Sequence, residues 1–404
     1  MNTSIYRTRT EWVPKVYEKI KRNDDYWVIG LDSGYGGMKG FSPNKYFCFP
    51  SYARLLEKDK SMVTMYDRQD VIYEDLDTGE IYLLGRNAQN SISRNDINDT
   101  DNELFNRKRF KSKKFYVLCM AAIGLAAMPN QKHSDFHGIG KEIIIQAGLP
   151  PAYLEMDREP YIHMFSRAAN YRLKVGKNPW QEFHIAIDPK NVYVMAQPSG
   201  TMASINIGNN GQYIPEARNY LTGNVLILDI GFHTMDVFGM KGHVRSINES
   251  FDRFGMRSIL QMVSDEIKKE KNTEIRVSCM QKYLEKGTIP FTSEMGMDED
   301  EFRFSDEEWP FDTILERCSL KVCNAALKHL STITDQFADY EYLVVTGGTG
   351  AAWYAWIQEK FKGSKLKIIP GNQNDSLDMQ YANVRGYYLF RTMMIQQILS
   401  LIHI

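Results

Sequence analysis

Two aspartates, Asp32 and Asp229, each end an apolar run and stand directly before a glycine-containing turn. The apolar runs, 26–31 and 225–228, are typical of buried strands. A carboxylate at such a strand end can hold a hydrated magnesium ion, which keeps several of its waters. Either aspartate alone would be explained as a cap of its own turn. Because the two stand in matching positions, we predict that both contact Mg²⁺, mainly through water.

The turn after Asp32 is rich in glycine. Gly34, Gly36 and Gly37 permit the positive φ angles that aim successive backbone N–H groups at an anion. Lys39 follows on the returning strand, where its ammonium group can reach a phosphate oxygen. The first phosphate-binding turn is therefore predicted to comprise Ser33, Gly34, Tyr35, Gly36 and Lys39.

A second turn of the same kind follows Asp229. Thr234 offers a hydroxyl that can donate a hydrogen bond to a phosphate oxygen. His233 invites a general-base role, but a histidine in a turn more often contributes only its backbone N–H, and we favour that alternative. The second phosphate-binding turn is predicted to comprise Gly231, Phe232, His233 and Thr234.

A third glycine turn, Thr346–Gly350, follows the apolar run 343–345. It fails as a dinucleotide fingerprint because Trp353 stands where glycine or alanine is needed for close helix packing. A glycine turn that enters a helix can instead cover an adenosine and its α-phosphate. We assign that role to Gly347, Gly348 and Thr349. No GxxxxGK[ST] motif occurs in the chain, which excludes a P-loop protein.

Gln197 follows the apolar run 192–196. An amide at a strand end beside a nucleotide can orient an attacking water, as glutamine does in other nucleotide hydrolases. The alternative is an ordinary polar loop residue. We predict a catalytic set made of Gln197, Asp32 and Asp229.

The elements that must position these residues follow from apolar patterns and turn residues. The run 115–128 is too short to span a bilayer and predicts a buried helix. Strands are predicted at 26–31, 38–41, 81–84, 142–145, 183–187, 192–196 and 225–229, and helices at 257–269, 313–337, 351–361 and 384–404.

The interval from Asp32 to Lys39 equals that from Asp229 to Asp236, so one hairpin occurs twice, about two hundred residues apart. This spacing predicts an α/β protein with two duplicated domains around a nucleotide cleft. The predicted divisions are an N-terminal extension (1–25), domain I (26–222, with an inserted subdomain at about 50–105), domain II (223–370) and C-terminal helices that return to domain I (371–404).

The composition is that of a globular protein. The chain has 404 residues and a net charge of −1, so no strong field draws it to nucleic acid or to a membrane. Its five cysteines lack CxxC spacing, which argues against a disulfide framework or a zinc site. Residues 1–25 lack the apolar core of a signal peptide. We expect a cytoplasmic protein that binds neither DNA nor membrane directly.

Three charged or apolar segments have alternative explanations. The basic run 107–114 is expected to be a solvated entry to the helix at 115–128, with a contact to a neighbouring subunit or to a nucleic-acid complex as the alternative. The acidic run 294–309 is expected to be a solvated surface insertion. The apolar segment 390–404 is expected to pack on the first domain or a partner, since a membrane-lying helix usually carries more cationic residues.

The three turns, in this order, resemble the two phosphate loops and the adenosine loop of the actin, heat-shock chaperone and sugar-kinase superfamily. The matching segments are Gly30-Leu31-Asp32-x-Gly34 with Lys39, Asp229-x-Gly231-x-x-Thr234-x-Asp236, and Gly347-Gly348-Thr349. Within it, the chain is most similar to bacterial actin-like plasmid-segregation proteins of the ParM type. That similarity rests on Asp236, on Gly148-Leu149-Pro150 and on Tyr381–Gly386.

The resemblance implies an actin-like fold that binds ATP, or GTP, with Mg²⁺ between its domains and assembles into filaments. It also implies a DNA-bound adaptor at a plasmid centromere, and it puts Gln197 where the hydrolytic water is positioned. Two alternatives stay open. One is a small-molecule kinase of the same superfamily, for which the chain offers no clear catalytic aspartate. The other is a scaffold that binds nucleotide without hydrolysis.

Overall fold

The computed structural model describes residues 3–6, 10–56, 70–92, 107–130, 132–284, 286–298 and 301–402. Its first large sheet has six strands in the order β1-β4-β3-β2-β8-β11. The strands are β1 (Glu11–Pro14), β2 (Tyr26–Ser33), β3 (Gly37–Ser42), β4 (Lys45–Pro50), β8 (Glu142–Leu149) and β11 (Val192–Ala196).

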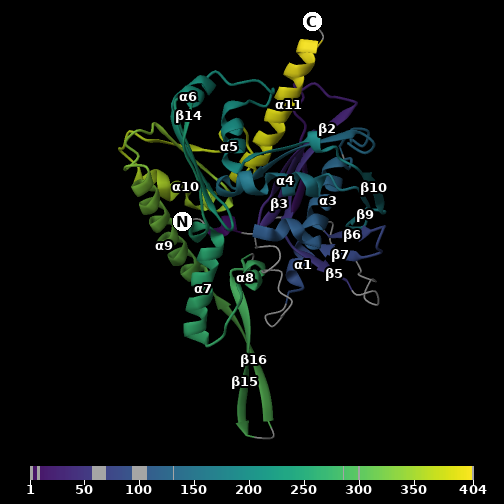
Figure 1. Ribbon diagram of the computed structural model, residues 1–404. Coiled ribbons are helices and arrows are strands. Elements are labelled where there is room, and N and C mark those ends of the chain that lie inside the picture. Colours follow the sequence, from purple (N-terminus) through teal and green to yellow (C-terminus); the bar gives the residue numbers. More distant parts are fainter. Residues whose placement is uncertain are drawn as a thin grey trace.

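The second large sheet has five strands in the order β14-β13-β12-β17-β18. These are β12 (Asn224–Ile230), β13 (Met235–Lys241), β14 (Val244–Phe251), β17 (Tyr342–Thr346) and β18 (Lys367–Pro370). Both sheets are drawn side by side in Figure 1, with helices on their outer faces.

The five strands of the second sheet repeat the topology of five strands of the first sheet; only β1 has no counterpart. In the first, β4, β3 and β2 form an antiparallel meander, and β8 and β11 then add in parallel. In the second, β14, β13 and β12 form the meander, and β17 and β18 add in parallel. Asp32 pairs with Lys39, and Asp229 pairs with Asp236, at the same place in each hairpin. The duplicated hairpin predicted from the sequence is therefore present.

A third, smaller sheet extends from the first. Its order is β10-β9-β6-β7-β5, with β5 (Ala53–Leu55), β6 (Val71–Asp75), β7 (Ile81–Leu84), β9 (Ala169–Val175) and β10 (Gln181–Ile185). The inserted β-rich part thus draws on residues 169–185 as well as on 53–84. The two strands predicted at 183–187 and 192–196 form as β10 and β11, joined by a 3₁₀ turn, η5 (Pro189–Asn191), and they lie in different sheets.

Most predicted helices form with small shifts at their ends. The helix α3 (Lys113–Ala127) is buried along almost its whole length, as its apolar sequence predicts. The others are α1 (Arg86–Asn90), α4 (Leu154–Phe165), α5 (Gln197–Asn206), α6 (Ala217–Thr222), α7 (Met256–Lys271), α8 (Val277–Tyr283), α9 (Asp312–Ile333), α10 (Gly348–Lys360) and α11 (Ala382–Ile402).

The helices α5 and α11 cross in very close contact between the two large sheets. A Cβ on Gly386 of α11 would lie 1.7 Å from the carbonyl oxygen of Gly200 of α5, so neither position tolerates a side chain without movement. Beyond this crossing, α11 packs on β2, β3 and β8 of the first sheet. No helix in the described ranges is long and apolar enough to cross a bilayer.

The acidic run expected as a surface insertion forms most of a long hairpin. Its strands are β15 (Thr288–Asp298) and β16 (Glu301–Pro310), and it projects from the body of the molecule (Figure 1). Asp306, Glu307 and Glu308 are exposed, whereas Trp309 is buried against Phe291 at the base of the hairpin. The domain boundaries at residues 222 and 370 stay predictions.

Candidate functional site

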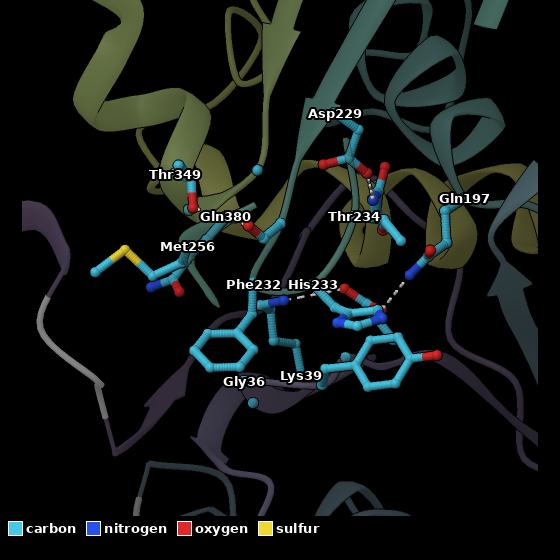
Figure 2. A pocket seen from close by; sticks show the side chains of 18 of the residues that line it. Gly36, Lys39, Gln197, Asp229, Phe232, His233, Thr234, Met256, Thr349 and Gln380 are labelled. Carbon is cyan, nitrogen blue, oxygen red and sulfur yellow. Dashed lines mark hydrogen bonds and ion pairs between the residues drawn. The ribbon is translucent and has the colours of Figure 1, made fainter. Parts of the chain in front are cut away.

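A cleft lies between the turns of the two repeated hairpins (Figure 2). All but one of the predicted site residues line it. Those that do are Asp32, Gly34, Tyr35, Gly36, Lys39, Gln197, Asp229, Gly231, Phe232, His233, Thr234, Gly347, Gly348 and Thr349.

Ser33 is the exception. Its side chain points away from the cleft and forms a 2.6 Å hydrogen bond with the hydroxyl of Tyr161, and the residue is buried. Since alternate residues of a strand face opposite sides, the neighbour of Asp32 points away from it. This geometry keeps the Ser33 side chain out of the cleft, so the side chain does not support the predicted place of Ser33 in the phosphate-binding turn.

The two phosphate turns touch each other directly. A Cβ on Gly36 would lie 2.9 Å from the Cβ of Phe232, and the rings of Tyr35 and His233 lie 4.6 Å apart between centroids. Gly34, Gly36 and Gly37 permit positive φ angles, but the structure does not use this freedom at any of the three. In the described residues, positive φ occurs at Gly347, with φ of 84°, but not at those three. At Gly36, glycine is required because the opposite turn packs against its backbone.

The second turn is held by the elements that follow it. The carbonyl oxygen of Gly231 accepts hydrogen bonds from the Met256 N–H at 3.2 Å and from the Thr349 hydroxyl at 2.8 Å. The carbonyl oxygen of Phe232 accepts one from the Arg257 N–H at 2.8 Å. The N-terminus of α7 and the third glycine turn therefore hold the carbonyl groups of the second turn in place. The second turn is thus preorganised by these hydrogen bonds.

Asp32 is surrounded by donors. Its Oδ2 accepts from the Lys39 ammonium at 3.0 Å, and its Oδ1 accepts from the Gln197 amide at 2.9 Å. Burial opposes the charge of Lys39, but the neighbouring Asp32 carboxylate outweighs this, so the Lys39 pKa is raised. Lys39 thus remains an ammonium group at the floor of the cleft.

Asp229 is less well neutralised. Its Oδ2 accepts a 2.7 Å hydrogen bond from the amide of Asn383, the second residue of α11. Burial, together with the charge of Asp32, raises the Asp229 pKa to about 6. Burial and the charge of Asp229 also raise the pKa of Asp236 well above its ordinary value. Lys39 acts on Asp229 from a distance, but within the described residues neither acid of the second hairpin forms an ion pair.

These carboxylates fit a hydrated magnesium ion better than a dehydrated metal centre. In the described residues, no three His, Cys, Asp or Glu side chains are grouped so as to hold a metal ion. Mg²⁺ keeps several waters and commonly uses one or two carboxylates together with substrate phosphates. The raised pKa of Asp229 means that a nearby cation would relieve an electrostatic cost at that residue.

Comparisons with known proteins give no sequence-level match: neither a family model nor a curated protein matches the chain. Solved structures do. A non-polymerisable quadruple mutant of pCBH ParM has a TM-score of 0.64 and 18% identity over 91% of this chain and 99% of that one. A 15-stranded ParM filament from Clostridium botulinum has a TM-score of 0.61 and 17% identity over 91% and 99%. An archaeal actin homologue in complex with ADP has 0.59 and 16% over 89% and 97%.

The chain has an actin-like fold of the ParM type. The repeated sheets, with their turns facing across a cleft, are the two halves of this fold. The sequence predicted this architecture from the two hairpins and the third glycine turn.

Within this actin-like fold, His233 contributes its ring to packing between the turns. Burial lowers the pKa of His233, so the ring is neutral at pH 7. Its buried Nδ1 has no hydrogen-bond partner among the described residues. The His233 ring, labelled in Figure 2, contacts the Tyr35 ring at an interplanar angle of 46°.

The structure adds Arg109 to the cleft of the actin-like fold, where the sequence analysis expected a solvated basic run. Arg109 is only 4% exposed, and its guanidinium donates a 2.6 Å hydrogen bond to the carbonyl oxygen of Ser33. It also lies 4.0 Å from the centroid of the Tyr35 ring. The neighbouring Arg107, Lys108 and Lys111 are exposed, as expected for a solvated basic run. The sequence of the run does not distinguish Arg109 from these neighbours.

Proposed function

We propose that this protein is an actin-like ATPase that assembles into filaments in response to nucleotide. The observation that carries the proposal is the pair of facing turns with Asp32 and Asp229 behind them. Similar structures include a protein in complex with ADP and a ParM filament, which supports nucleotide binding and self-assembly here. GTP stays an alternative substrate, because none of the site residues named above distinguishes adenine from guanine.

The triphosphate is proposed to lie between the two turns. Lys39 and the guanidinium of Arg109 supply positive charge, and the backbone N–H groups of both turns with the Thr234 hydroxyl donate hydrogen bonds to the phosphates. Mg²⁺, when bound through water near Asp32 and Asp229, offsets negative charge that develops as the bond between the β- and γ-phosphates breaks. Thr349 and its two preceding glycines cover the nucleoside.

Gln197 is proposed to orient the hydrolytic water. The residue begins α5 at the carboxyl end of β11, and its main-chain carbonyl accepts a 3.2 Å hydrogen bond from the Tyr387 hydroxyl. The water forms a bond to the γ-phosphorus, the bond from phosphorus to the bridging oxygen breaks, and ADP leaves with inorganic phosphate. The proton of the water passes to phosphate or solvent. Since an amide is a weak base, hydrolysis by this arrangement is expected to be slow.

Assembly is proposed to follow from a shift between two relative positions of the halves. A triphosphate held by both turns favours the closed position, and loss of the γ-phosphate removes that bias. The partner expected from the resemblance is a DNA-bound adaptor on a plasmid, and the expected location is the bacterial cytoplasm. The proposed domain limits are those given from the sequence.

The test is a single time course of light scattering and phosphate release with Mg²⁺ and ATP, GTP, ADP or a non-hydrolysable ATP analogue. We expect scattering to rise with ATP and to decay as phosphate appears, and to persist with the analogue. Absence of assembly in every nucleotide would contradict the proposal. Phosphate transfer to a small molecule in a panel of sugars, without filaments, would favour a kinase, and binding without phosphate release would favour a scaffold.

A further inference from the structure

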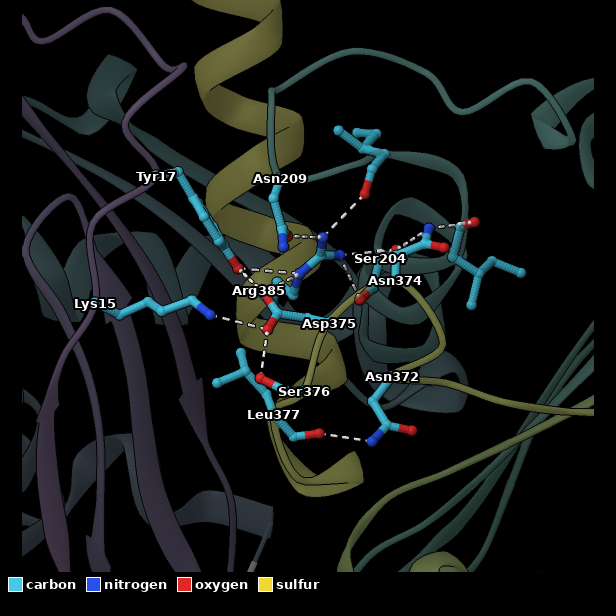
Figure 3. A network of polar contacts seen from close by, with 12 residues as sticks. Lys15, Tyr17, Ser204, Asn209, Asn372, Asn374, Asp375, Ser376, Leu377 and Arg385 are labelled. Atoms are coloured by element: carbon cyan, nitrogen blue, oxygen red, sulfur yellow. Dashed lines mark hydrogen bonds and ion pairs between the residues drawn. The ribbon is translucent and has the colours of Figure 1, made fainter.

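We call residues 3–25, which precede the first repeated hairpin, the N-terminal arm; its described parts, 3–6 and 10–25, both contact the body of the molecule. Its strand β1 pairs with β4 at the edge of the first sheet. Farther along, the Lys15 ammonium and the Tyr17 hydroxyl both donate to Asp375, at 2.9 Å and 2.5 Å, and Asp375 lies beside the buried Arg385 (Figure 3). This end of the arm is thus anchored to the first sheet and to α11.

The beginning of the arm lies in the other half. Residues Thr3–Tyr6 form a 3₁₀ turn, η1, and Tyr6 is only 7% exposed within the core of the second sheet. The Tyr6 hydroxyl forms hydrogen bonds with the Ser319 hydroxyl of α9 and with the indole N–H of Trp353 of α10, the latter at 2.9 Å. Figure 1 accordingly marks the N-terminus beside α9 and α10.

The arm therefore joins the two halves over a short length of chain. Four Cα steps separate Tyr6 from Thr10, and at 3.8 Å per step they span at most about 15 Å. Tyr6 is part of the second core, while Thr10 immediately precedes β1 in the first sheet. Such a short connection limits how far the second half can move from the first while both ends of the arm stay docked.

The docked turn η1 also reaches the cleft. Ile5 and Tyr6 line it together with Met256 and Thr349. Trp353, which binds Tyr6, lies one helical turn after Thr349, so η1 sits beside the third glycine turn. In Figure 2, Met256 and Thr349 lie on one side of the cleft and Gln197 on the other. The apolar lining is therefore at the end away from Gln197.

This distribution matches the two ends of a nucleotide. The phosphates need the cations and N–H groups near Asp32, whereas a flat, largely apolar base is best accommodated between apolar side chains. We propose that the N-terminal arm forms one wall of the base-binding end, with Ile5 and Tyr6 packing beside the base, and that it thereby sets nucleotide affinity. This inference rests on the proposed nucleotide binding, which it extends to a segment outside the three turns.

The test compares a ligand that has a base with one that lacks it. Calorimetry would measure the Kd of Mg²⁺·ATP and of Mg²⁺·tripolyphosphate for the wild type, for a deletion of residues 1–9, for Ile5→Ala and for Tyr6→Phe. Tyr213→Phe, at a half-exposed tyrosine outside this cleft, is the matched control. Thermal melting without ligand would report the stability of each variant.

We expect the deletion to raise the Kd for ATP about 10-fold, with Ile5→Ala and Tyr6→Phe each raising it about 2- to 5-fold. The Kd for tripolyphosphate is expected to change less than 2-fold, because a merely structural role of the arm would weaken both ligands together. Equal ATP affinity in all variants, equal loss for both ligands, or tighter ATP binding after the deletion would overturn the proposal. A wild type that binds neither ligand would instead refute the proposed nucleotide binding.

Discussion

The first and second phosphate turns share one backbone plan but differ in how their aspartates are compensated. Asp32 lies between Lys39 and Gln197, which donate to both of its oxygens. Asp229 has one amide donor, Asn383, and the residue paired with it is another acid, Asp236. The duplicated hairpin has thus kept its geometry while the residue seven positions later became a cation in one half and an acid in the other.

This difference assigns different tasks to the two turns. The first carries its own positive charge and the amide proposed to position water, so it is the side suited to the chemical step. In the second turn the negative charge of Asp229 is poorly compensated, as its raised pKa shows. This side therefore gains most from a cation that binds together with the nucleotide. Each prediction below tests one part of this contrast.

The largest effect is expected for Gln197→Ala, which removes the water-positioning group from the first side. Phosphate release should fall by roughly 10²- to 10³-fold, the usual cost of losing one positioned polar group at the reacting atoms. The Kd for ATP should stay within about 3-fold. Gln380→Ala, a second glutamine on the same cleft, is the control and should retain near wild-type hydrolysis. Equal losses in the two variants would show that Gln197 has no special role.

Lys39→Met should destabilise the fold, because it leaves the buried Asp32 carboxylate without its cation. We expect a loss of about 2–3 kcal/mol in the free energy of unfolding, below the full cost of breaking a buried pair since 18% of the Lys39 side chain is exposed. Urea unfolding of the nucleotide-free protein measures this. Adding Asp32→Asn to Lys39→Met should recover most of the stability but none of the hydrolysis. If the double variant is no more stable than the single one, Asp32 is not the reason for the loss.

Asp229→Asn should have the opposite effect on stability. The Asp229 pKa is raised from 3.8 to about 6, so the native state holds a proton more tightly than the unfolded state does. The associated stability is fully present below pH 4 and is lost as pH rises through 6. At pH 7 the substitution removes the cost of a buried charge, and the nucleotide-free variant should gain roughly 1–3 kcal/mol.

The gain from Asp229→Asn should vanish in unfolding experiments well below pH 3.8, where the wild-type carboxyl is protonated in both states. The asparagine oxygen can still accept the hydrogen bond from Asn383, so that contact is preserved. The same substitution at Asp32 should lower stability, because it disrupts the pair with Lys39. Similar changes in stability for Asp229→Asn and Asp32→Asn would contradict the proposed difference between the two turns.

The smallest effect is expected for Thr349→Val, which removes the hydroxyl that ties the third turn to the carbonyl of Gly231. The cost should be about 0.5–1.5 kcal/mol, as for a typical hydrogen bond, and the Kd for ATP should rise a few-fold. Thr332→Val, whose exposed hydroxyl bonds only within its own helix, should leave binding unchanged. Unaltered ATP binding in Thr349→Val would show that the third turn acts independently of the second.

Much of the site could be predicted because its residues are close together in sequence. An apolar run, an aspartate and a glycine turn are local features, and they placed Asp32 and Asp229 in hairpins that the structure contains. The third turn was predicted from the same kind of local pattern. In the structure, Gly347 at the start of α10 has the positive φ that glycine permits. The order of the three turns along the chain was then enough to predict the actin-like fold.

The remainder depends on contacts between distant segments, which local patterns do not encode. Glycine is needed at Gly36 because Phe232, almost two hundred residues later, packs against it, and the sequence suggested a φ angle instead. Arg109 turns inward because Tyr35 and the Ser33 carbonyl offer it a buried place. Likewise β9 joins the small sheet by pairing with β6, far earlier in the chain, and β10 then pairs with β9.

The most direct test of this account is the Mg²⁺ dependence of ATP binding in the wild type, Asp32→Asn and Asp229→Asn. Calorimetry would give the ratio of the Kd in EDTA to the Kd in Mg²⁺ for each protein. We predict a ratio well above 10 for the wild type, a ratio only a few-fold lower for Asp32→Asn, and a ratio near 1 for Asp229→Asn. A wild-type ratio near 1, or equal losses at the two aspartates, would contradict it.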